Sequence, residues 1–375
     1  MLENRYNRVK MNGIILSTEH KEEIVDAVLD WYDHNARTLP WRISPEAKIG
    51  GIIPDPYHVW LSEIMLQQTT VAAVIPYFEK FTEEWPTIEK LAAADLDDIL
   101  TAWAGLGYYA RARNLHKCAV YITQELGGEF PKTYDDLLKL PGVGTYTAAA
   151  ISSIVYDIPA TVVDGNVERV LSRICNITAP LPGSRPIIRD VAEKLTPDHR
   201  PGDYAQAIMD IGATICTPRS LKCGNCPIEA DCISKSLGTA EDLPARVRKK
   251  TRPTRRGYAF WAEYDGKVWL RRRPEQGLLG GMMEVPSDEW APSNSWENIP
   301  PPRVPIIANW DILPGVVRHT FTHFHLELKI IRLELEEMIN LQEGEWCVVE
   351  DRDNYALPTV MKKIFAHVGE PLLDL

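Results

Sequence analysis

The 375-residue sequence lacks any apolar run close to the roughly 20 residues that a membrane-spanning helix needs. Near its start, Arg5, Arg8 and Lys10 precede an apolar run of only Gly13–Leu16, whereas a secretory signal needs about 7–15 apolar residues. We therefore expect no membrane association and no secretory signal. The expected location is the cytoplasm.

Basic residues are also in deficit, since 52 acids oppose 41 bases and the net charge is −11. That balance argues against a nucleic-acid partner, because such proteins are usually basic. The charge is unevenly spread, however. The segment Arg246–Arg256 carries seven bases and no acid, while Glu327–Asp353 carries nine acids and three bases. Because salt screens charges beyond about 8–10 Å, an acidic chain can still present a local basic strip.

Cysteine is scarce, with seven in the chain, but four of them fall within one short stretch. Six, two and five residues separate them in turn, at Cys216, Cys223, Cys226 and Cys232. Without a signal peptide, this pattern favours a metal or cluster site over disulfides. Zinc and a [4Fe–4S] cluster both accept four thiolates. Zinc sites more often pair two Cys-x-x-Cys knuckles, and this stretch has one, so both groups stay open.

Hydrophobic periodicity divides the chain into two regions with a basic connection. From residue 19 to 237 apolar residues recur at spacings of three and four, which is typical of helices. Residues 238–256 are rich in Arg, Lys and Pro and are interpreted as a linker. Over 257–370 the period becomes two, and Tyr258–Tyr264 and Lys267–Arg271 flank an Asp-Gly hairpin signal. The pattern predicts a mainly α domain followed by a smaller α+β domain.

A helical hairpin with a glycine-rich turn is predicted in the first domain. Thr133 can cap a short helix, and the Pro-Gly-Val-Gly turn at 141–144 precedes a second helix that begins near Thr145. The glycines leave bare backbone N–H groups at a helix N-terminus, which is a place that binds phosphate. The candidate DNA contacts here are Gly142, Val143 and Gly144. An ordinary helical hairpin is the alternative.

Two carboxylates are candidates for chemistry. Asp164 stands where a helix N-cap belongs, and we expect bare N–H groups and the helix dipole to lower its pKa. Glu63 is the only charge in the apolar stretch Trp60–Gln68, and burial there would raise its pKa. One protonated and one anionic carboxyl is the pair that cleaves glycosidic bonds. A plain capping Asp and an exposed helical Glu are the alternatives.

These segments together resemble the helix–hairpin–helix DNA glycosylases with an iron–sulfur cluster, and within them the adenine-specific mismatch glycosylases of the MutY family. The resemblance covers about residues 20–370 in order. Besides the four-cysteine stretch, the motifs that carry it are Trp60–Thr69, Gly105–His116, Leu140–Thr147, Val163–Val170 and Arg318–His325.

The resemblance implies two helical subdomains, an iron–sulfur loop and a C-terminal Nudix-like domain. It implies removal of adenine mispaired with 8-oxoguanine or guanine, after the adenine is flipped out of duplex DNA. Glu63 matches the general acid and Asp164 the carboxylate that stabilises the oxocarbenium-like sugar. Tyr146 and Asn166 match residues that assist at this centre. The four cysteines match the ligands of a [4Fe–4S] cluster.

Further roles follow from the same resemblance. Gln68 and Tyr108 match side chains inserted into the base stack, and Arg111 belongs to the basic strip expected to face DNA. Phe321, Thr322 and His323 match the family's Phe-Ser-His loop that senses 8-oxoguanine, with Thr in place of Ser. We expect a monomer, associated with the nucleoid if the source is prokaryotic.

Endonuclease III-like lyases carry a Lys where this chain has Tyr146, and a Tyr cannot form their Schiff base. A monofunctional glycosylase is therefore predicted. The alternatives are a glycosylase-lyase on the same scaffold, a mismatch sensor without catalysis, and a Nudix phosphohydrolase fused to a DNA-binding module. The segment after Gly277–Pro286 lacks the Glu-rich metal-binding helix that the last alternative requires.

Overall fold

The structure is a computed structural model that describes residues 18–247, 251–338 and 344–369. Internal contacts group the described residues into two compact units. Unit 1 comprises 18–92 and 117–247, and unit 2 comprises 93–116 and 251–369. Segment 93–116 thus groups with the C-terminal part of the chain, which the predicted domain boundaries of 19–237 and 257–370 did not anticipate.

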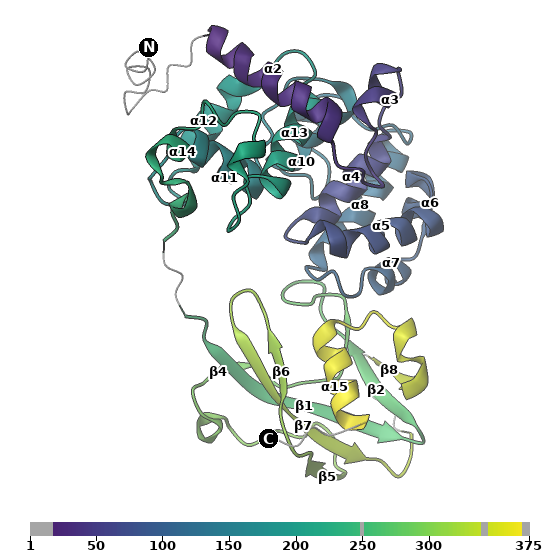
Figure 1. Ribbon diagram of the computed structural model, residues 1–375. Helices are drawn as coiled ribbons and strands as arrows, with labels where there is room; N and C mark the ends of the chain where they lie inside the picture. The colour runs from purple at the N-terminus through teal and green to yellow at the C-terminus, as the bar shows by residue number, and fades with distance from the viewer. Residues whose placement is uncertain (1–17, 248–250, 339–343, 370–375) are drawn as a thin grey trace. The chain divides into compact units, whose positions relative to one another are not determined.

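Unit 1 is helical, as the periodicity predicts (Figure 1). Its helices are α2 (Thr18–Asn35), α3 (Pro45–Ile49), α4 (Pro56–Leu66), α5 (Val71–Glu84), α9 (Tyr134–Leu137), α10 (Thr145–Tyr156), α11 (Gly165–Ile174), α12 (Arg185–Leu195), α13 (Pro201–Thr214) and α14 (Ile233–Leu237), and α6 (Ile88–Ala93) and α8 (Ala110–Glu125) continue into unit 2. In the described part of the chain, no helix combines the length and apolarity needed to cross a bilayer.

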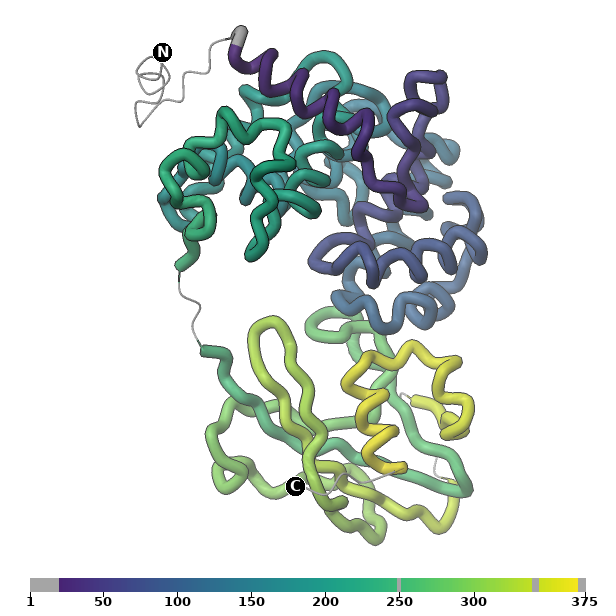
Figure 2. Tube along the Cα trace, viewed as in Figure 1, coloured from purple at the N-terminus to yellow at the C-terminus, as the bar shows by residue number. Residues whose placement is uncertain are grey.

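The first helix of unit 1 packs against helices from far along the sequence. Figure 2 shows α2, in purple, beside the teal and green path of α12 and α13. Its apolar face, which includes Ile24 and Val28, joins Val170 of α11 and Ile208 of α13 in one buried cluster. This packing fixes α11 and α13 side by side, and both helices contribute residues to the site described below.

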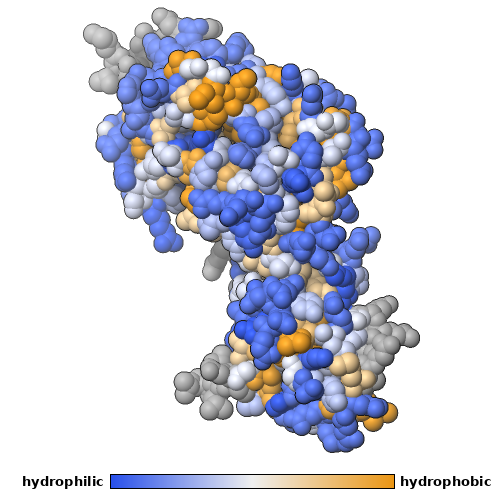
Figure 3. Space-filling view, turned by 90° about the vertical axis from the view of Figure 1, so that its right-hand side faces the viewer, coloured by the Kyte–Doolittle hydropathy of each residue, from blue (hydrophilic) through white to orange (hydrophobic). Residues whose placement is uncertain are grey.

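The segment Ile43–Asp55, whose role the sequence did not explain, forms α3 and an exposed turn. Ser44 caps the helix through Ala47 N, and Lys48 Nζ lies 3.0 Å from Asp157 Oδ1. Apolar side chains gather on the side of unit 1 that Figure 3 faces. The exposed ones of this segment are Ile49, Ile52 and Ile53.

Unit 2 is built on one eight-stranded sheet with the order β3-β2-β1-β7-β5, in which β4, β6 and β8 pair with β1, β7 and β2. Strands β1 and β7 are parallel and the other pairs are antiparallel. The elements are α7 (Leu96–Ala102), β1 (Thr254–Tyr264), β2 (Lys267–Arg272), β3 (Met283–Glu284), β4 (Ala291–Pro292), β5 (Asn309–Ile312), β6 (Val317–Thr320), β7 (His325–Glu334), β8 (Gly344–Val348) and α15 (Thr359–Gly369).

Alternation along β1 gives the sheet two apolar faces. Ala259 and Trp261 point to the face covered by α15, where the rings of Trp261 and Phe365 lie 4.8 Å apart. Tyr258 and Phe260 point to the other face, toward Ile331 and Trp296. The period-two prediction and the Asp-Gly hairpin between β1 and β2 are therefore confirmed.

The predicted linker of 238–256 has regular structure or backbone contacts at both of its ends. Leu181 N donates to Ala245 O, and Arg173 Nε donates to Leu243 O, so this stretch packs on unit 1. At the other end, Thr254 already begins β1. Residues 248–250 of the predicted linker lie outside the described residues.

Candidate active site

Glu63 lies on the buried face of α4. Asp55 begins this helix by accepting a hydrogen bond from Tyr57 N at 2.8 Å, with Pro56 at the first position. Glu63 is 6% exposed, which confirms the buried interpretation over an exposed helical position. Burial raises the pKa of Glu63 to about 7, against the lowering effect of the Tyr146 hydroxyl. Among the described residues, its Oε2 has no hydrogen-bond partner.

Tyr146 stands beside Glu63 from the first turn of α10, where the glycine-rich turn ends. Its hydroxyl interacts with the Glu63 carboxyl and lies 3.6 Å from Met209 Sδ. Burial, followed by the charges of Glu63 and Asp164, raises the pKa of Tyr146 well above its usual value. The phenol is therefore neutral at any physiological pH and can only donate or accept a hydrogen bond.

Asp164 caps α11, as predicted. Its Oδ1 accepts from Asn166 N at 2.9 Å and Val167 N at 2.7 Å, and its Oδ2 accepts from Asn166 Nδ2 at 2.7 Å. The predicted direction of its pKa shift is nevertheless wrong. Burial raises the pKa of Asp164 by more than these hydrogen bonds lower it. The capping groups thus offset part of the cost of an anion in this partly buried place.

Asn166 is oriented from its far side by Arg169. Arg169 Nη2 donates to Asn166 Oδ1 at 2.8 Å, which turns the amide nitrogen toward Asp164. The same guanidinium donates to Gly212 O and to Cys216 O. One side chain therefore links the turn at Asp164 to α13 and to the first cysteine of the four-cysteine stretch.

An arginine–aspartate pair that the sequence did not indicate lies next to this centre. Arg42 Nη1 is 2.7 Å from Asp210 Oδ2, and Asp210 is fully buried. Burial raises the pKa values of Glu63 and Tyr146, and the charge of Arg42 opposes part of that rise. Since 168 residues separate the two partners, only the packing of the helices brings them together.

Two glutamines, Gln67 and Gln68, follow the C-terminal end of α4, the helix that carries Glu63. Gln67 Nε2 contacts Thr147 Oγ1 at 3.4 Å, so it too belongs to the site, although the sequence singled out only its neighbour. Gln68 has φ of 59°, and Tyr108 in unit 2 has φ of 51°. Left-handed backbone is uncommon for residues other than glycine and often marks functional sites. The two side chains predicted to enter the base stack thus share this feature.

The predicted phosphate-binding turn lies between α9 and α10. Gly142 has φ of 77°, a conformation that favours glycine, while Val143 is buried and Gly144 caps α10 without a side chain. Thr133 caps the first helix, as predicted, and this helix ends at Leu137. The N–H groups at the start of α10 stay available, which agrees with the proposed contact to phosphate.

The four cysteines surround a cavity between α11, α13 and α14. It measures about 430 Å³, part of it open to solvent, and its other lining is mostly aliphatic, with Ile211 and Ile215 among it. Arg173 Nη1 donates to Cys216 Sγ at 3.2 Å. Within the described ranges, no three Cys, His, Asp or Glu side chains converge closely enough to hold a single metal ion. All four cysteine side chains line this one cavity, as the ligands of a shared metal centre would.

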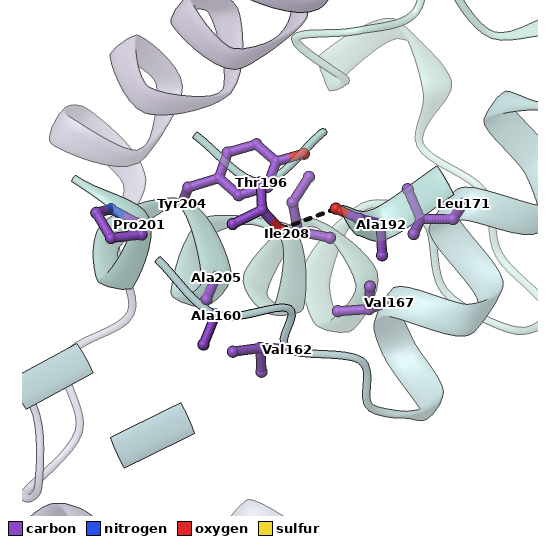
Figure 4. A pocket seen from close by; sticks show the side chains of 10 residues that line it. All are labelled: Ala160, Val162, Val167, Leu171, Ala192, Thr196, Pro201, Tyr204, Ala205 and Ile208. Atoms are coloured by element: carbon purple, nitrogen blue, oxygen red, sulfur yellow. Dashed lines mark hydrogen bonds between the residues drawn. The ribbon is translucent and has the colours of Figure 1, made fainter. Parts of the chain in front are cut away.

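A second cavity lies behind the Asp164 turn, and most of the side chains that line it are apolar. Figure 4 shows Val162 and Val167 facing it from below, with Tyr204, Ala205 and Ile208 of α13 along one side. None of the candidate catalytic side chains lines it.

In unit 2, the predicted recognition residues form the tip of the β6–β7 hairpin. Phe321 N donates to Phe324 O at 2.9 Å and closes the turn, and Thr322 and His323 are exposed. The rings of Phe321 and Phe324 lie 4.8 Å apart. The two phenylalanines anchor the tip, and Thr322 Oγ1 lies 2.7 Å from the Tyr108 hydroxyl of the same unit.

Arg111, predicted to contact DNA, is engaged within its own segment. Its Nη2 donates to Leu106 O and Gly107 O, and its guanidinium lies over the rings of Trp103 and Tyr108. Burial lowers the pKa of Arg111 to about 10. These contacts shape the 106–108 turn, so a role through the position of Tyr108 is better supported than a direct phosphate contact.

The chain matches two families of known proteins. Residues 61–197 match the HhH-GPD superfamily of base excision DNA repair proteins, and residues 257–367 match the NUDIX domain. The Adenine DNA glycosylase of Homo sapiens is 34% identical, over 90% of this chain and 72% of that one. That of Buchnera aphidicola subsp. Baizongia pistaciae is 38% identical, over 91% and 95%. Among solved structures, a thermostable thymine-DNA glycosylase is similar at a TM-score of 0.50 and 27% identity, over 58% of this chain and 97% of that one. Both predicted domain types are thereby confirmed, and the chain belongs to the adenine DNA glycosylase family of base-excision repair enzymes.

Proposed function

We propose that the enzyme hydrolyses the N-glycosidic bond of adenine mispaired with 8-oxoguanine or guanine in duplex DNA. The observation that carries this proposal is the pairing in unit 1 of a buried Glu63, with pKa about 7, and a hydrogen-bonded Asp164. Glu63 protonates the flipped adenine, which makes the base a better leaving group. Asp164 faces the positive charge that develops on the sugar.

The other residues of the centre support these two. The Tyr146 hydroxyl lies beside Glu63, and Asn166 donates to Asp164 while Arg169 fixes its amide. Asp210 holds the Arg42 guanidinium beside this centre and also pairs with Arg37. In unit 2, the exposed Thr322 and His323 are the groups proposed to sense 8-oxoguanine opposite the adenine. The Thr322 hydroxyl can make the hydrogen bond of the family's serine, with an added methyl group.

The assay that tests the proposal uses a duplex with one adenine opposite 8-oxoguanine. We expect adenine release by the wild-type protein and strand cutting only after alkali treatment, because Tyr146 has no amine to form a Schiff base. Asp164→Asn is expected to abolish release. Strand cutting without alkali that disappears in Tyr146→Phe would favour the lyase. Tight binding to the mismatch with no base release would favour the sensor.

We further propose that Cys216, Cys223, Cys226 and Cys232 hold a [4Fe–4S] cluster. When bound, the cluster cross-links the four-cysteine stretch and so stabilises the loop against α11. The purified protein is expected to be brown, with broad visible absorption and about four iron atoms per chain. Cys223→Ser is expected to lose this colour, whereas Cys347→Ser, buried in unit 2, keeps it. A colourless protein with about one zinc per chain would contradict the assignment.

A further inference from the structure

Two neighbouring arginines at the start of β1 differ sharply in their surroundings. Arg256 Nε is 2.8 Å from Glu327 Oε2, and its guanidinium also donates to Ser293 O. The side chain of Arg255 makes no hydrogen bond or ion pair with any residue in the described ranges, and its Nε is shielded from solvent without a partner. Adjacent positions thus hold one neutralised and one uncompensated guanidinium.

The alternation of β1 explains the difference. Arg255 lies on the same face as Ala259 and pairs in register with Leu326, whereas Glu327 belongs to the opposite face with Arg256. The nearest acid on the neighbouring strand is therefore out of reach of Arg255. Its position is still well defined, because β1 is held between β7 and β4 at this point.

The side chain of Arg255 packs on the tip of the β6–β7 hairpin. Its guanidinium lies 4.4 Å from the centre of the Phe324 ring, and Phe324 in turn packs on Phe321 and Trp290. Just beyond, His325 N donates to Pro253 O at 2.9 Å, which ties the end of the hairpin to the chain entering β1. The cation is therefore fixed next to the exposed tip at Thr322 and His323.

A second arginine, Arg273, lies over the Trp290 ring of the same aromatic group, and its surroundings differ from those of Arg255. Arg273 lies 5.4 Å from the Trp290 ring, but it is paired with the buried Glu284 and donates to Leu278 O. Arg273 thus completes the core, while Arg255 keeps its charge unmatched. A planar cation held on a ring with free donors is well suited to bind a phosphate.

We propose that Arg255 binds a backbone phosphate of the DNA strand whose base the Phe321–Phe324 hairpin reads. This inference rests on the proposed function, because it assumes that the hairpin faces DNA. Phosphate contacts fix the register of a protein on the duplex without reading sequence. Arg255 would thus position the strand while Thr322 and His323 examine the base.

The test is the salt dependence of binding to an undamaged duplex, measured by fluorescence anisotropy with Arg255→Gln. Each phosphate contact adds about 0.9 to the slope of log affinity against log salt. The loss of affinity relative to wild type is therefore expected to shrink about 3.5-fold between 50 and 200 mM salt. Arg255→Lys keeps the charge and is expected to restore most of the slope.

Arg303 provides the matched control. Arg303 is exposed and lies in the segment before β5. Arg303→Gln removes the same positive charge as Arg255→Gln, at a site away from the hairpin tip. An unchanged slope in Arg255→Gln, or an equal change in Arg303→Gln, would overturn the proposal, as would an Arg255→Lys slope equal to that of Arg255→Gln. Thermal unfolding checks that Arg255→Gln is folded. If the wild-type protein ignores 8-oxoguanine, the proposed function fails, yet the slopes on undamaged DNA still decide the role of Arg255.

Discussion

Glu63→Gln is expected to slow adenine release by about 10²–10⁴-fold, the usual contribution of a general acid. Gln has nearly the volume of Glu, so the packing of α4 is retained while the proton donor is lost. The measurement is the single-turnover rate of adenine release, at saturating enzyme, from a duplex that carries one adenine opposite 8-oxoguanine. A variant that keeps more than a tenth of the wild-type rate would show that Glu63 does not donate the proton.

The pH profile gives an independent view of the same group. Because burial raises the pKa of Glu63 to about 7, the protonated fraction falls as pH rises through neutrality. The wild-type single-turnover rate should therefore decline above pH 7 and decline again in acid, where Asp164 takes up a proton. The residual rate of Glu63→Gln should lack the upper limb. A wild-type rate that increases through pH 7 would contradict the assignment.

The free energy of unfolding also depends on the pKa of Glu63, and its measurement shows whether Glu63→Gln is folded. The pKa of Glu63 is about 7 in the folded chain against 4.5 for the free group, so between these values the folded state holds a proton that the unfolded state releases. Folding stability of the wild type therefore falls with rising pH in this window, by about 3 kcal/mol relative to Glu63→Gln. Chemical denaturation of both proteins at pH 5 and pH 8 measures the difference. Parallel curves would mean that Glu63 titrates normally.

Local patterns predicted the parts of this site that local rules govern. The cap at Asp164, the turn at 141–144 and the hairpin at Asp265 each depend on a few consecutive residues, and each is confirmed. The buried charge in an apolar helix was likewise a valid signal for Glu63.

The predictions that were wrong, and the features that were missed, concern contacts between residues distant in the sequence. The pKa of Asp164 was predicted from its own N–H groups, but the net shift is set by how deeply other helices bury it. The Arg42–Asp210 pair joins residues far apart in the chain, with no local pattern to mark it. The arginines at 111 and 256 counted toward a basic strip, yet both are engaged by carbonyl or carboxylate groups. Counting charge along a sequence cannot separate such arginines from a free one.

At Gly212 in α13, close packing between helices matters more than the low helix propensity of glycine. A Cβ built there would lie 2.6 Å from Asn166 Cβ and 3.2 Å from the Asn166 backbone. Real Cβ atoms essentially never approach so closely, so α11 and α13 can come together only because residue 212 is glycine. Gly212 O also accepts from Arg169, which orients the Asn166 amide. The close approach therefore sets the position of the Asp164 turn.

Gly212→Ala is expected to be destabilising and to impair catalysis, against the helix-propensity rule. In a helix, alanine in place of glycine ordinarily stabilises by about 1 kcal/mol. Here the overpacked Cβ should cost about 1–3 kcal/mol and push Asn166 and Asp164 away from their positions. Because a misplacement near 1 Å can cost about 100-fold in rate, adenine release should fall far more than affinity for undamaged DNA. Denaturant unfolding, single-turnover rates and anisotropy measure the three quantities.

Gly183→Ala separates this effect from the general consequences of replacing a glycine. Its Cβ would lie 3.4 Å from Pro180 O, an ordinary contact, and residue 183 is not part of the catalytic centre. We expect its stability to change by no more than about 0.5 kcal/mol and its rate to equal that of the wild type. If Gly212→Ala proved as stable and as active as Gly183→Ala, α13 must be able to slide away from α11. The turn at Asp164 would then be held by Arg169 and its own N–H donors, without the close contact between the helices.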